Sequence, residues 1–269
     1  MDDRVSISIS DGVADVRLVR AEKMNALDAA MFEALVAASD RLAREKGVRA
    51  VVLSGEGRAF CAGLDMGRFA AMKEKGGNGP AGETRDLAAR THGLANFPQQ
   101  AVWGWRQLPV PVIAAIQGVA FGGGFQLALG ADMRFLAPEA RMSIMEIKWG
   151  LVPDMAGTPI LASLVRDDIL RELTYTGRIF SAQEAMSYGL ATRICDDPRA
   201  AAFEVAREIA GKSPEAIRAA KRMLNNLAVE AGPALLAESV EQMKLMGGAN
   251  QIEAVRANME KRVPRFADV

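Results

Sequence analysis

The sequence predicts an α/β protein that ends in a helical section, and three features indicate this fold class. Residues 5–9 alternate between apolar and polar side chains, and Asp11 and Gly12 precede a second apolar run, which is the pattern of a β-hairpin. The order strand, helix, strand that comes next favours a crossover between parallel strands. The last part of the chain has helical periodicity. We therefore expect an α/β body over residues 1–195 and helices over 196–269.

Local signals define the expected elements one by one. Asp28 can cap a helix that has one apolar face, Gly47 can end it, and a mainly apolar run over residues 48–53 predicts the next strand. Ser181 and Glu184 have the spacing of a capping box at another helix start. We expect further strands at 110–116, 133–136 and 142–144, and C-terminal helices at 199–211, 213–230, 233–246 and 248–261.

The composition is that of an ordinary globular protein, with 33 basic and 33 acidic side chains in 269 residues and a net charge of zero. This balance argues against nucleic acid or an anionic membrane as a partner. Residues 107–131 carry no charge, but prolines and glycines interrupt them, so we expect a strand and a turn rather than a membrane span. No apolar signal segment is visible at the start, and we expect a cytoplasmic protein.

Several kinds of catalytic centre lack the residues they need. Cys61 and Cys195 are far apart and form no CxxC pair, which argues against a disulfide or a zinc site and fits a reducing compartment. His92 is the single histidine, and we expect it to be a solvated loop residue, so Ser-His-Asp and Cys-His machinery have no support. The glycines at 118–124 match neither GxGxxG nor a P-loop. No metal site is expected.

Two glycine-marked turns, at residues 54–65 and 118–126, each follow an expected strand. Glycine lets the backbone approach a ligand closely and leaves N–H groups unblocked. If the two turns converge, one N–H from each could hold a developing oxyanion. Taken singly, each can also be an ordinary tight turn.

Together with residues 20–27 before them and Glu146 and residues 150–153 after them, these turns resemble the crotonase (enoyl-CoA hydratase/isomerase) superfamily. The resemblance extends over nearly the whole chain, through the Glu260-Lys261-Arg262 stretch. It implies a crotonase-like spiral of ββα turns followed by a helical trimerisation region over 196–269. It also implies an acyl-CoA substrate, a homotrimer or homohexamer, and no cofactor besides the coenzyme A that belongs to the substrate.

The resemblance also implies roles for individual residues. The backbone amides of Leu64 and Gly123 match the family's oxyanion hole, and Glu146, Asp154 and Gln126 occupy its catalytic positions. The C-terminal Lys261 matches a lysine that approaches the coenzyme A 3′-phosphate from a neighbouring subunit, although a solvated helix-end lysine is an equal alternative. The residues expected to bind coenzyme A or substrate are Lys23, Ala26, Ala62, Gly63, Asp65, Met66, Gly122, Pro153 and Lys261.

One departure from the family pattern bears on the reaction. Hydratases of this family use glutamates at the positions of both Gln126 and Glu146, and an amide cannot accept and return a proton. Glu146 alone suffices for a 1,3-proton shift, so double-bond isomerisation is favoured, 2-enoyl-CoA hydration is the alternative, and a non-catalytic CoA-thioester binder is a second alternative. Asp154 resembles an aspartate of dienoyl-CoA isomerases, although an aspartate after proline is often only turn chemistry.

The surroundings of Glu146 and the shape of the pocket carry two further expectations. The apolar neighbours Met145, Ile147 and Trp149 are expected to raise the pKa of Glu146. The floor of the acyl pocket is expected to come from the 70–100 segment, Trp103, Trp105 and Trp149, with plain core packing an equal alternative for each tryptophan. The acyl chain itself cannot be inferred.

Overall fold

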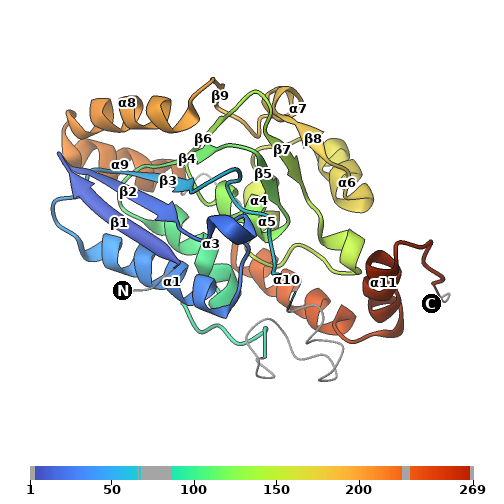
Figure 1. Cartoon of the computed structure of the whole chain (residues 1–269). Helices are drawn as coiled ribbons and strands as arrows, with labels where there is room; N and C mark the ends of the chain where they lie inside the picture. The colour runs from blue at the N-terminus through green and yellow to red at the C-terminus, as the bar shows by residue number, and fades with distance from the viewer. Residues whose placement is uncertain (1–3, 66, 68–85, 226–230, 267–269) are drawn as a thin grey trace.

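The computed structural model describes residues 4–65, 67, 86–225 and 231–266, and in this part of the chain the strands form two sheets (Figure 1). The larger sheet has the strand order β1 (Val5–Ser10), β2 (Val13–Leu18), β3 (Ala50–Gly55), β4 (Val112–Ile116), β6 (Met133–Leu136) and β9 (Arg193–Ile194). The smaller sheet has the order β5 (Val119–Phe121), β7 (Arg141–Ser143) and β8 (Phe180–Ser181).

The first two strands form the expected hairpin. They pair antiparallel, with Val5 opposite Leu18. Asp11 and Gly12 have φ angles of 52° and 78°, which is the left-handed backbone that a tight two-residue hairpin turn needs. The remaining pairs of the larger sheet are parallel, including the predicted pairing of β2 with β3 across a helix.

Beyond β3 the chain winds as a spiral between the two sheets. It passes from β4 in the larger sheet to β5 in the smaller one, then through α4 (Gly123–Leu129) back to β6 and again out to β7. The next turn runs through β8 and α7 (Ala182–Ser187) to β9. This alternation confirms the expected spiral of ββα turns.

Helices cover both faces of the larger sheet. In β3, Val51 and Leu53 face the main core with α1 (Ala29–Arg44) and α3 (Phe97–Gln107), whereas Val52 faces α8 (Pro198–Ala210) (Figure 1). This is the period-two alternation of a strand buried on both sides. After Ile194 the described residues form helices only, as expected, but α8 packs on the sheet and belongs to the core of the body.

The helices that the sequence predicted lie near their expected positions. Asp28 accepts a hydrogen bond from the Met31 amide at 2.8 Å, and Ser181 and Glu184 form the capping box. The first helix ends at Arg44 and not at Gly47, because Glu45 already has an extended backbone. The remaining helices are η1 (Ala21–Lys23), η2 (Glu146–Trp149), α5 (Gly157–Leu161), α6 (Asp167–Thr176), α9 (Pro214–Asn225), α10 (Ala231–Leu245) and α11 (Ala249–Glu260). Of all the helices, η1, α3, η2, α5 and α6 were not predicted.

Two negative findings hold for the described residues. Both cysteines are free thiols, Cys61 buried and Cys195 partly buried. Among helices in the described part of the chain, none is long and apolar enough to cross a membrane. Residues 226–230, which end the helix expected at 213–230, lie outside the described residues.

Candidate active site

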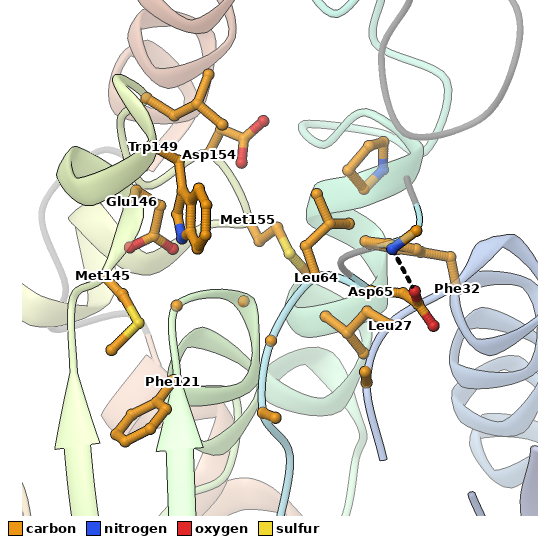
Figure 2. A pocket seen from close by; sticks show the side chains of 18 of the residues that line it. Leu27, Phe32, Leu64, Asp65, Phe121, Met145, Glu146, Trp149, Asp154 and Met155 are labelled. Carbon is orange, nitrogen blue, oxygen red and sulfur yellow. Dashed lines mark hydrogen bonds between the residues drawn. The ribbon is translucent and has the colours of Figure 1, made fainter. Parts of the chain in front are cut away.

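A cavity of about 570 Å³ is lined by the 22–32 segment, the two glycine turns, η2 with the segment after it, and α10. Its lining is mainly apolar, with a few charged groups, as in most small-molecule sites. Figure 2 shows side chains from η2 and the segment after it on one side, and side chains from the 27–32 and 64–65 segments on the other. The labelled lining residues are Leu27, Phe32, Leu64, Asp65, Phe121, Met145, Glu146, Trp149, Asp154 and Met155.

The two glycine turns meet at this cavity. Cys61 donates its amide to the Val119 carbonyl at 3.0 Å and accepts from the Phe121 amide at 3.1 Å. A Cβ atom on Gly63 would lie 2.5 Å from the Phe121 oxygen and 3.8 Å from the Gly123 nitrogen, and Gly63 has a φ of 86°. Only glycine fits this approach and this backbone without strain. The convergence on which the sequence argument depended is therefore present.

The amides of Leu64 and Gly123 remain available at the cavity. The bridge between the 27 and 64 segments uses the Gly63 oxygen, at 2.8 Å from the Leu27 amide, and the Asp65 amide, at 3.1 Å from the Leu27 oxygen. Gly123 is the first residue of α4, so its amide has no acceptor within the helix. Within the described segments neither amide donates a hydrogen bond. Two such donors beside one cavity can bind an oxygen that carries negative charge.

Glu146 reaches the same place because β5 and β7 pair in parallel. Phe121 lies opposite Ser143, and the Gly122 amide donates to the Ser143 oxygen at 3.0 Å, so the chain after β7 passes the glycine turn. Glu146 begins η2 three residues later and is 9% exposed. A Cβ atom on Gly122 would lie 3.4 Å from its Oε1. The carboxyl group thus lies against the turn that carries Gly123.

The environment of Glu146 favours the protonated form. Burial raises its pKa to about 7, and the charge of Glu238 acts in the same direction. Of the expected apolar neighbours, Met145 and Trp149 line the same cavity, whereas Ile147 is 44% exposed. Oε1 accepts a hydrogen bond of 2.7 Å from Gln126, which by itself lowers the pKa. Oε2 is buried and has no partner among the described residues. One oxygen is therefore held in place and the other is free to exchange a proton.

Gln126 can act only as a donor toward Glu146. Its carbonyl oxygen accepts from the Met155 amide at 2.9 Å and from the Gly157 amide at 3.0 Å. Because backbone amides can only donate, these two bonds identify the carboxamide oxygen, and the NH₂ group must therefore face the Glu146 carboxylate. Gln126 is 1% exposed and does not line the cavity.

Asp154 lines the cavity and is partly buried. Burial raises its pKa to about 8, and the charges of Glu238 and Glu146 raise it further, whereas a hydrogen bond from Gln242 lowers it. The Gln242 oxygen is itself held by the Val152 amide at 3.1 Å. Each pocket carboxyl thus has its own glutamine, anchored to the backbone through its oxygen.

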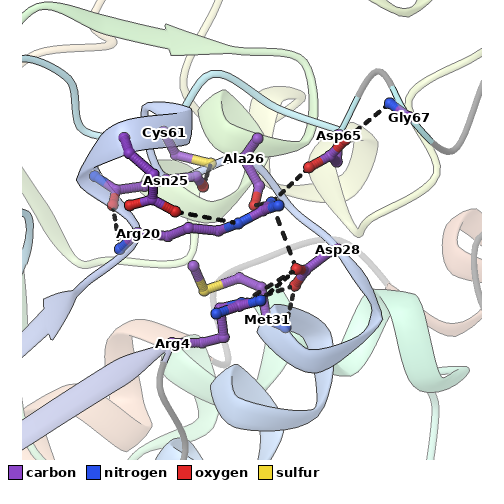
Figure 3. A network of polar contacts seen from close by, with 10 residues as sticks. Arg4, Arg20, Asn25, Ala26, Asp28, Met31, Cys61, Asp65 and Gly67 are labelled. Carbon is purple, nitrogen blue, oxygen red and sulfur yellow. Dashed lines mark hydrogen bonds and ion pairs between the residues drawn. The ribbon is translucent and has the colours of Figure 1, made fainter.

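The polar network in Figure 3 connects two segments that line the cavity. Arg20 forms an ion pair of 2.6 Å with Asp65 and one of 3.5 Å with Asp28, and donates to the Ala26 oxygen at 2.9 Å. Burial alone raises the pKa of Asp65, but hydrogen bonds from Gly67 and Arg20 make the net shift downward. The Asp65 carboxylate therefore ties the 62–65 segment to the 20–28 segment.

Most of the other expected binding residues also line the cavity, and a few do not. The structure places Lys23, Ala26, Ala62, Gly63, Asp65 and Gly122 in the lining. Pro153 is buried but does not line it, and Lys261 is exposed at the end of α11, outside it. Met66 lies outside the described residues.

The tryptophans and the histidine divide between cavity, core and surface. Trp149 lines the cavity, whereas Trp103 and Trp105 pack in the main core. Most of the 70–100 segment is outside the described residues, and Pro98 is its one described contribution to the lining. His92 is partly buried and contacts Thr91 and Phe97, away from the carboxyls.

Sequence reasoning did not identify Glu238 and Gln242, two buried polar residues of α10. Glu238 is 5% exposed and Gln242 is 5% exposed. They stand four residues apart, on the helix face that also carries the buried Leu235. The sequence did contain a signal for them: both are polar residues at helix positions where the periodicity calls for an apolar side chain.

No group of three or more His, Cys, Asp or Glu suited to a metal occurs in the ranges that the structure covers.

Comparison with known proteins identifies the family. The model of the enoyl-CoA hydratase/isomerase family matches residues 8–269. A probable enoyl-CoA hydratase of Mycobacterium bovis is 35% identical over 264 residues, which cover 97% of this chain and 98% of that protein. A mitochondrial Delta(3,5)-Delta(2,4)-dienoyl-CoA isomerase of Mus musculus is 31% identical over 256 residues, covering 93% of this chain and 77% of the relative.

Solved structures agree with the sequence relatives. The crystal structure of an enoyl-CoA hydratase/isomerase from Mycobacterium paratuberculosis superposes with a TM-score of 0.84 at 26% identity, covering 95% of this chain and 98% of the other. The match thus includes both the spiral body and the C-terminal helices. The chain belongs to the enoyl-CoA hydratase/isomerase (crotonase) family, whose enzymes act on acyl-CoA thioesters.

Proposed function

We propose that this enzyme shifts a double bond in an enoyl-CoA, with Glu146 as the acid and base. The observation that carries the proposal is the pairing of Glu146 with Gln126. The carboxyl has one oxygen held by a fixed donor and one buried oxygen without a partner, beside two available backbone amides. A carboxyl with a pKa of about 7 can both take and return a proton near neutral pH.

The reaction proceeds in two balanced proton transfers. Oε2 of Glu146 removes a proton from C2 of a 3-enoyl-CoA, and the electron pair moves onto the thioester oxygen. The amides of Leu64 and Gly123 bind this oxyanion, and loss of one such donor typically costs about 10²–10³ in rate. The proton on Glu146 exchanges with solvent while the dienolate is bound. The protonated Glu146 then delivers a proton to C4, and a 2-enoyl-CoA with the double bond between C2 and C3 results.

Hydration of a 2-enoyl-CoA is the second candidate. It is supported by the hydratase names of relatives such as the Mycobacterium bovis protein, and by Asp154, a second carboxyl on the same cavity. Gln126 weighs against it, because its carboxamide is a donor locked by two backbone amides and cannot accept a proton from water.

The test incubates the protein with saturated, 2-enoyl, 3-enoyl and 3,5-dienoyl CoA esters in H₂O and in D₂O. Isomerisation leaves the product mass unchanged in H₂O, shifts its absorbance and, in D₂O, incorporates deuterium. A gain of one water identifies hydration instead. Binding of every ester without exchange at the α-carbon contradicts catalysis and indicates a CoA-thioester binder.

We also propose that the chain assembles as a homotrimer or a dimer of trimers, with Lys261 facing the coenzyme A of a neighbouring subunit and with no cofactor beyond the substrate's own coenzyme A. Exposed apolar side chains of the C-terminal helices support this assembly, because such surface is normally buried in an interface. They include Met223, Leu224, Ile252 and Met259. Sedimentation equilibrium is expected to give three or six chains per particle, and a monomer would contradict it.

A further inference from the structure

Glu238 is a buried carboxylate that the proposed reaction does not use. It lies on α10, is 5% exposed and does not line the cavity. Oε1 accepts from the Thr158 amide at 2.7 Å, and Oε2 accepts from the Ala156 amide at 2.9 Å and from the Gln99 side chain at 3.1 Å. Both oxygens are therefore occupied by neutral donors, and no cation pairs with the carboxylate in the described part of the chain.

The segment that Glu238 binds is also held by Gln126 of α4. The Gln126 oxygen accepts from the Met155 and Gly157 amides, so the amides of residues 155–158 are bound alternately by Gln126 and Glu238. Ala156 within this segment has a φ of 65°, a left-handed backbone that side chains other than glycine adopt at a cost. Four hydrogen bonds thus hold one strained turn.

This turn connects the two pocket carboxyls. Asp154 immediately precedes it, and Gln126, which it orients, donates the 2.7 Å hydrogen bond to Glu146. A movement of residues 155–158 would therefore displace the Asp154 carboxyl and the amide partner of Glu146 together. α10 contacts this turn through the two hydrogen bonds to Glu238.

We propose that Glu238 is a positioning residue: by holding the turn at residues 155–158, it keeps the Asp154 carboxyl and the Gln126 carboxamide in place beside Glu146. This inference rests on the proposed function, because it concerns the same acid–base site. Glu238 touches no substrate and acts only through Asp154, Gln126 and Glu146.

The charged groups around Glu238 fit this role. On the pocket side they are Asp154 and Glu146, whose pKa values its charge raises. On the side of α3, Arg90 interacts electrostatically with Glu238. Arg90 donates a hydrogen bond to Gln99 at 3.0 Å and forms none with the Glu238 carboxylate. Burial raises the pKa of Glu238 to about 7, so all three carboxyls titrate in the same range.

The test compares Glu238→Gln with wild type in two measurements. In the variant, an NH₂ group must face one of the amides that the carboxylate accepted from, and the negative charge is gone. We expect kcat to fall by roughly 10- to 100-fold with a smaller change in KM, because the turn moves only Asp154 and Met155 of the cavity lining and the other lining residues stay in place. We also expect the acidic limb of kcat/KM to move to lower pH, since removing a like charge lowers the pKa of the remaining carboxyls.

The second measurement does not need activity. The ¹³C chemical shift of the Asp154 carboxyl, followed against pH, is expected to titrate at lower pH in Glu238→Gln than in wild type. Glu241→Gln is the matched control, because Glu241 is an exposed glutamate of the same helix that pairs with Lys244. It is expected to leave both profiles at their wild-type positions.

A milder variant covers the case in which Glu238→Gln does not fold. Thr158→Val removes the hydroxyl that also hydrogen-bonds to Glu238 and keeps the backbone amide. Loss of this hydrogen bond raises the pKa of Glu238, so the group is neutral over more of the pH range. The kcat/KM profile and the Asp154 titration are then expected to move to lower pH, as in Glu238→Gln, but by a smaller amount.

The outcomes separate this inference from the proposed function. If Glu238→Gln folds but has the same pH profile and Asp154 titration as Glu241→Gln, the positioning role is overturned. If Glu238→Gln does not fold, a Thr158→Val variant whose pH profile and Asp154 titration match wild type overturns it as well. Absence of proton exchange in wild type contradicts the proposed function alone, because the Asp154 titration still measures the effect of Glu238.

Discussion

At the scale of single residues, the site depends on how two side chains share hydrogen bonds. Glu146 has one bonded and one free oxygen, and Gln126 is held so that only its NH₂ group can face the carboxylate. The pKa of Glu146 is about 7, mainly because burial penalises the charged form. The proton position on Glu146, and with it the reaction rate, is therefore sensitive to small changes in its neighbours.

The first prediction concerns pH and the loss of Glu146. The carboxylate must be deprotonated to act as the base, so kcat/KM is expected to rise with pH through about 7 and to be low below that value. Glu146→Gln is expected to lose about 10²–10⁴ in kcat/KM, measured with the ester that wild type converts. The exposed Glu139→Gln is the control. A Glu146→Gln profile equal to wild type would remove Glu146 from the mechanism.

The second prediction concerns the choice between isomerisation and hydration. In wild type, Gln126 donates a hydrogen bond of 2.7 Å to Oε1 of Glu146. In Gln126→Glu, two carboxyl groups face each other at this distance, so they share a proton and each raises the pKa of the other. We expect isomerisation at pH 7 to slow by roughly tenfold or more and hydration of a 2-enoyl-CoA to increase. Product mass measures both. An unchanged ratio of the two reactions would show that residue 126 does not select the reaction.

At the scale of elements, parallel pairing within the smaller sheet places the chemistry. β5 leads into the glycine turn and α4, and its neighbour β7 leads into η2, so Gly123 and Glu146 follow adjacent strand ends. The 60–64 segment extends this arrangement by pairing Cys61 with Ala120. The close approach of these backbones is possible only because Gly63 has no side chain.

The third prediction tests that approach with two alanine substitutions. Gly63 and Gly93 have φ angles of 86° and 66°, so alanine is strained at both positions. The two differ in the space available: a Cβ atom at Gly63 would lie 2.5 Å from the Phe121 oxygen, whereas a Cβ atom at Gly93 would have nothing within 4 Å. Gly63→Ala is expected to lose about 10² or more in kcat/KM, and Gly93→Ala to keep wild-type kinetics. Equal kinetics for the two variants would contradict a close approach at the oxyanion site.

At the scale of the whole molecule, the site costs stability at high pH. Three carboxyls have raised pKa values in the folded protein: about 8 for the partly buried Asp154 and about 7 for the buried Glu146 and Glu238, compared with ordinary values of 3.8 and 4.5 in the unfolded chain. Because the folded state binds more protons in this interval, the free energy of unfolding contributed by these groups falls as pH rises from about 4 to about 8.

The fourth prediction follows from this linkage. Asp154→Asn keeps an acceptor for Gln242 but removes the titration, so its Tm relative to wild type is expected to increase between pH 5 and pH 8 and to level off above about 8, the pKa of Asp154. Thermal unfolding followed by circular dichroism measures it. The control is Asp168→Asn at an exposed residue paired with Arg166, for which no increase is expected over that range. A constant difference for Asp154→Asn would show that this carboxyl is not protonated in the folded state.

The sequence by itself determined the hairpin at Asp11 and Gly12, the caps at Asp28 and Ser181, the family, and the residues on the two glycine turns, because these depend on neighbours in the chain or on short motifs. The tertiary structure alone decided that the Gln126 oxygen is held by residues 155 and 157, and that Glu238 of α10 holds residues 156 and 158. Hydrogen bonds between segments far apart in the sequence depend on how the sheets and helices pack, and periodicity carries no information about which partner a buried polar group will meet.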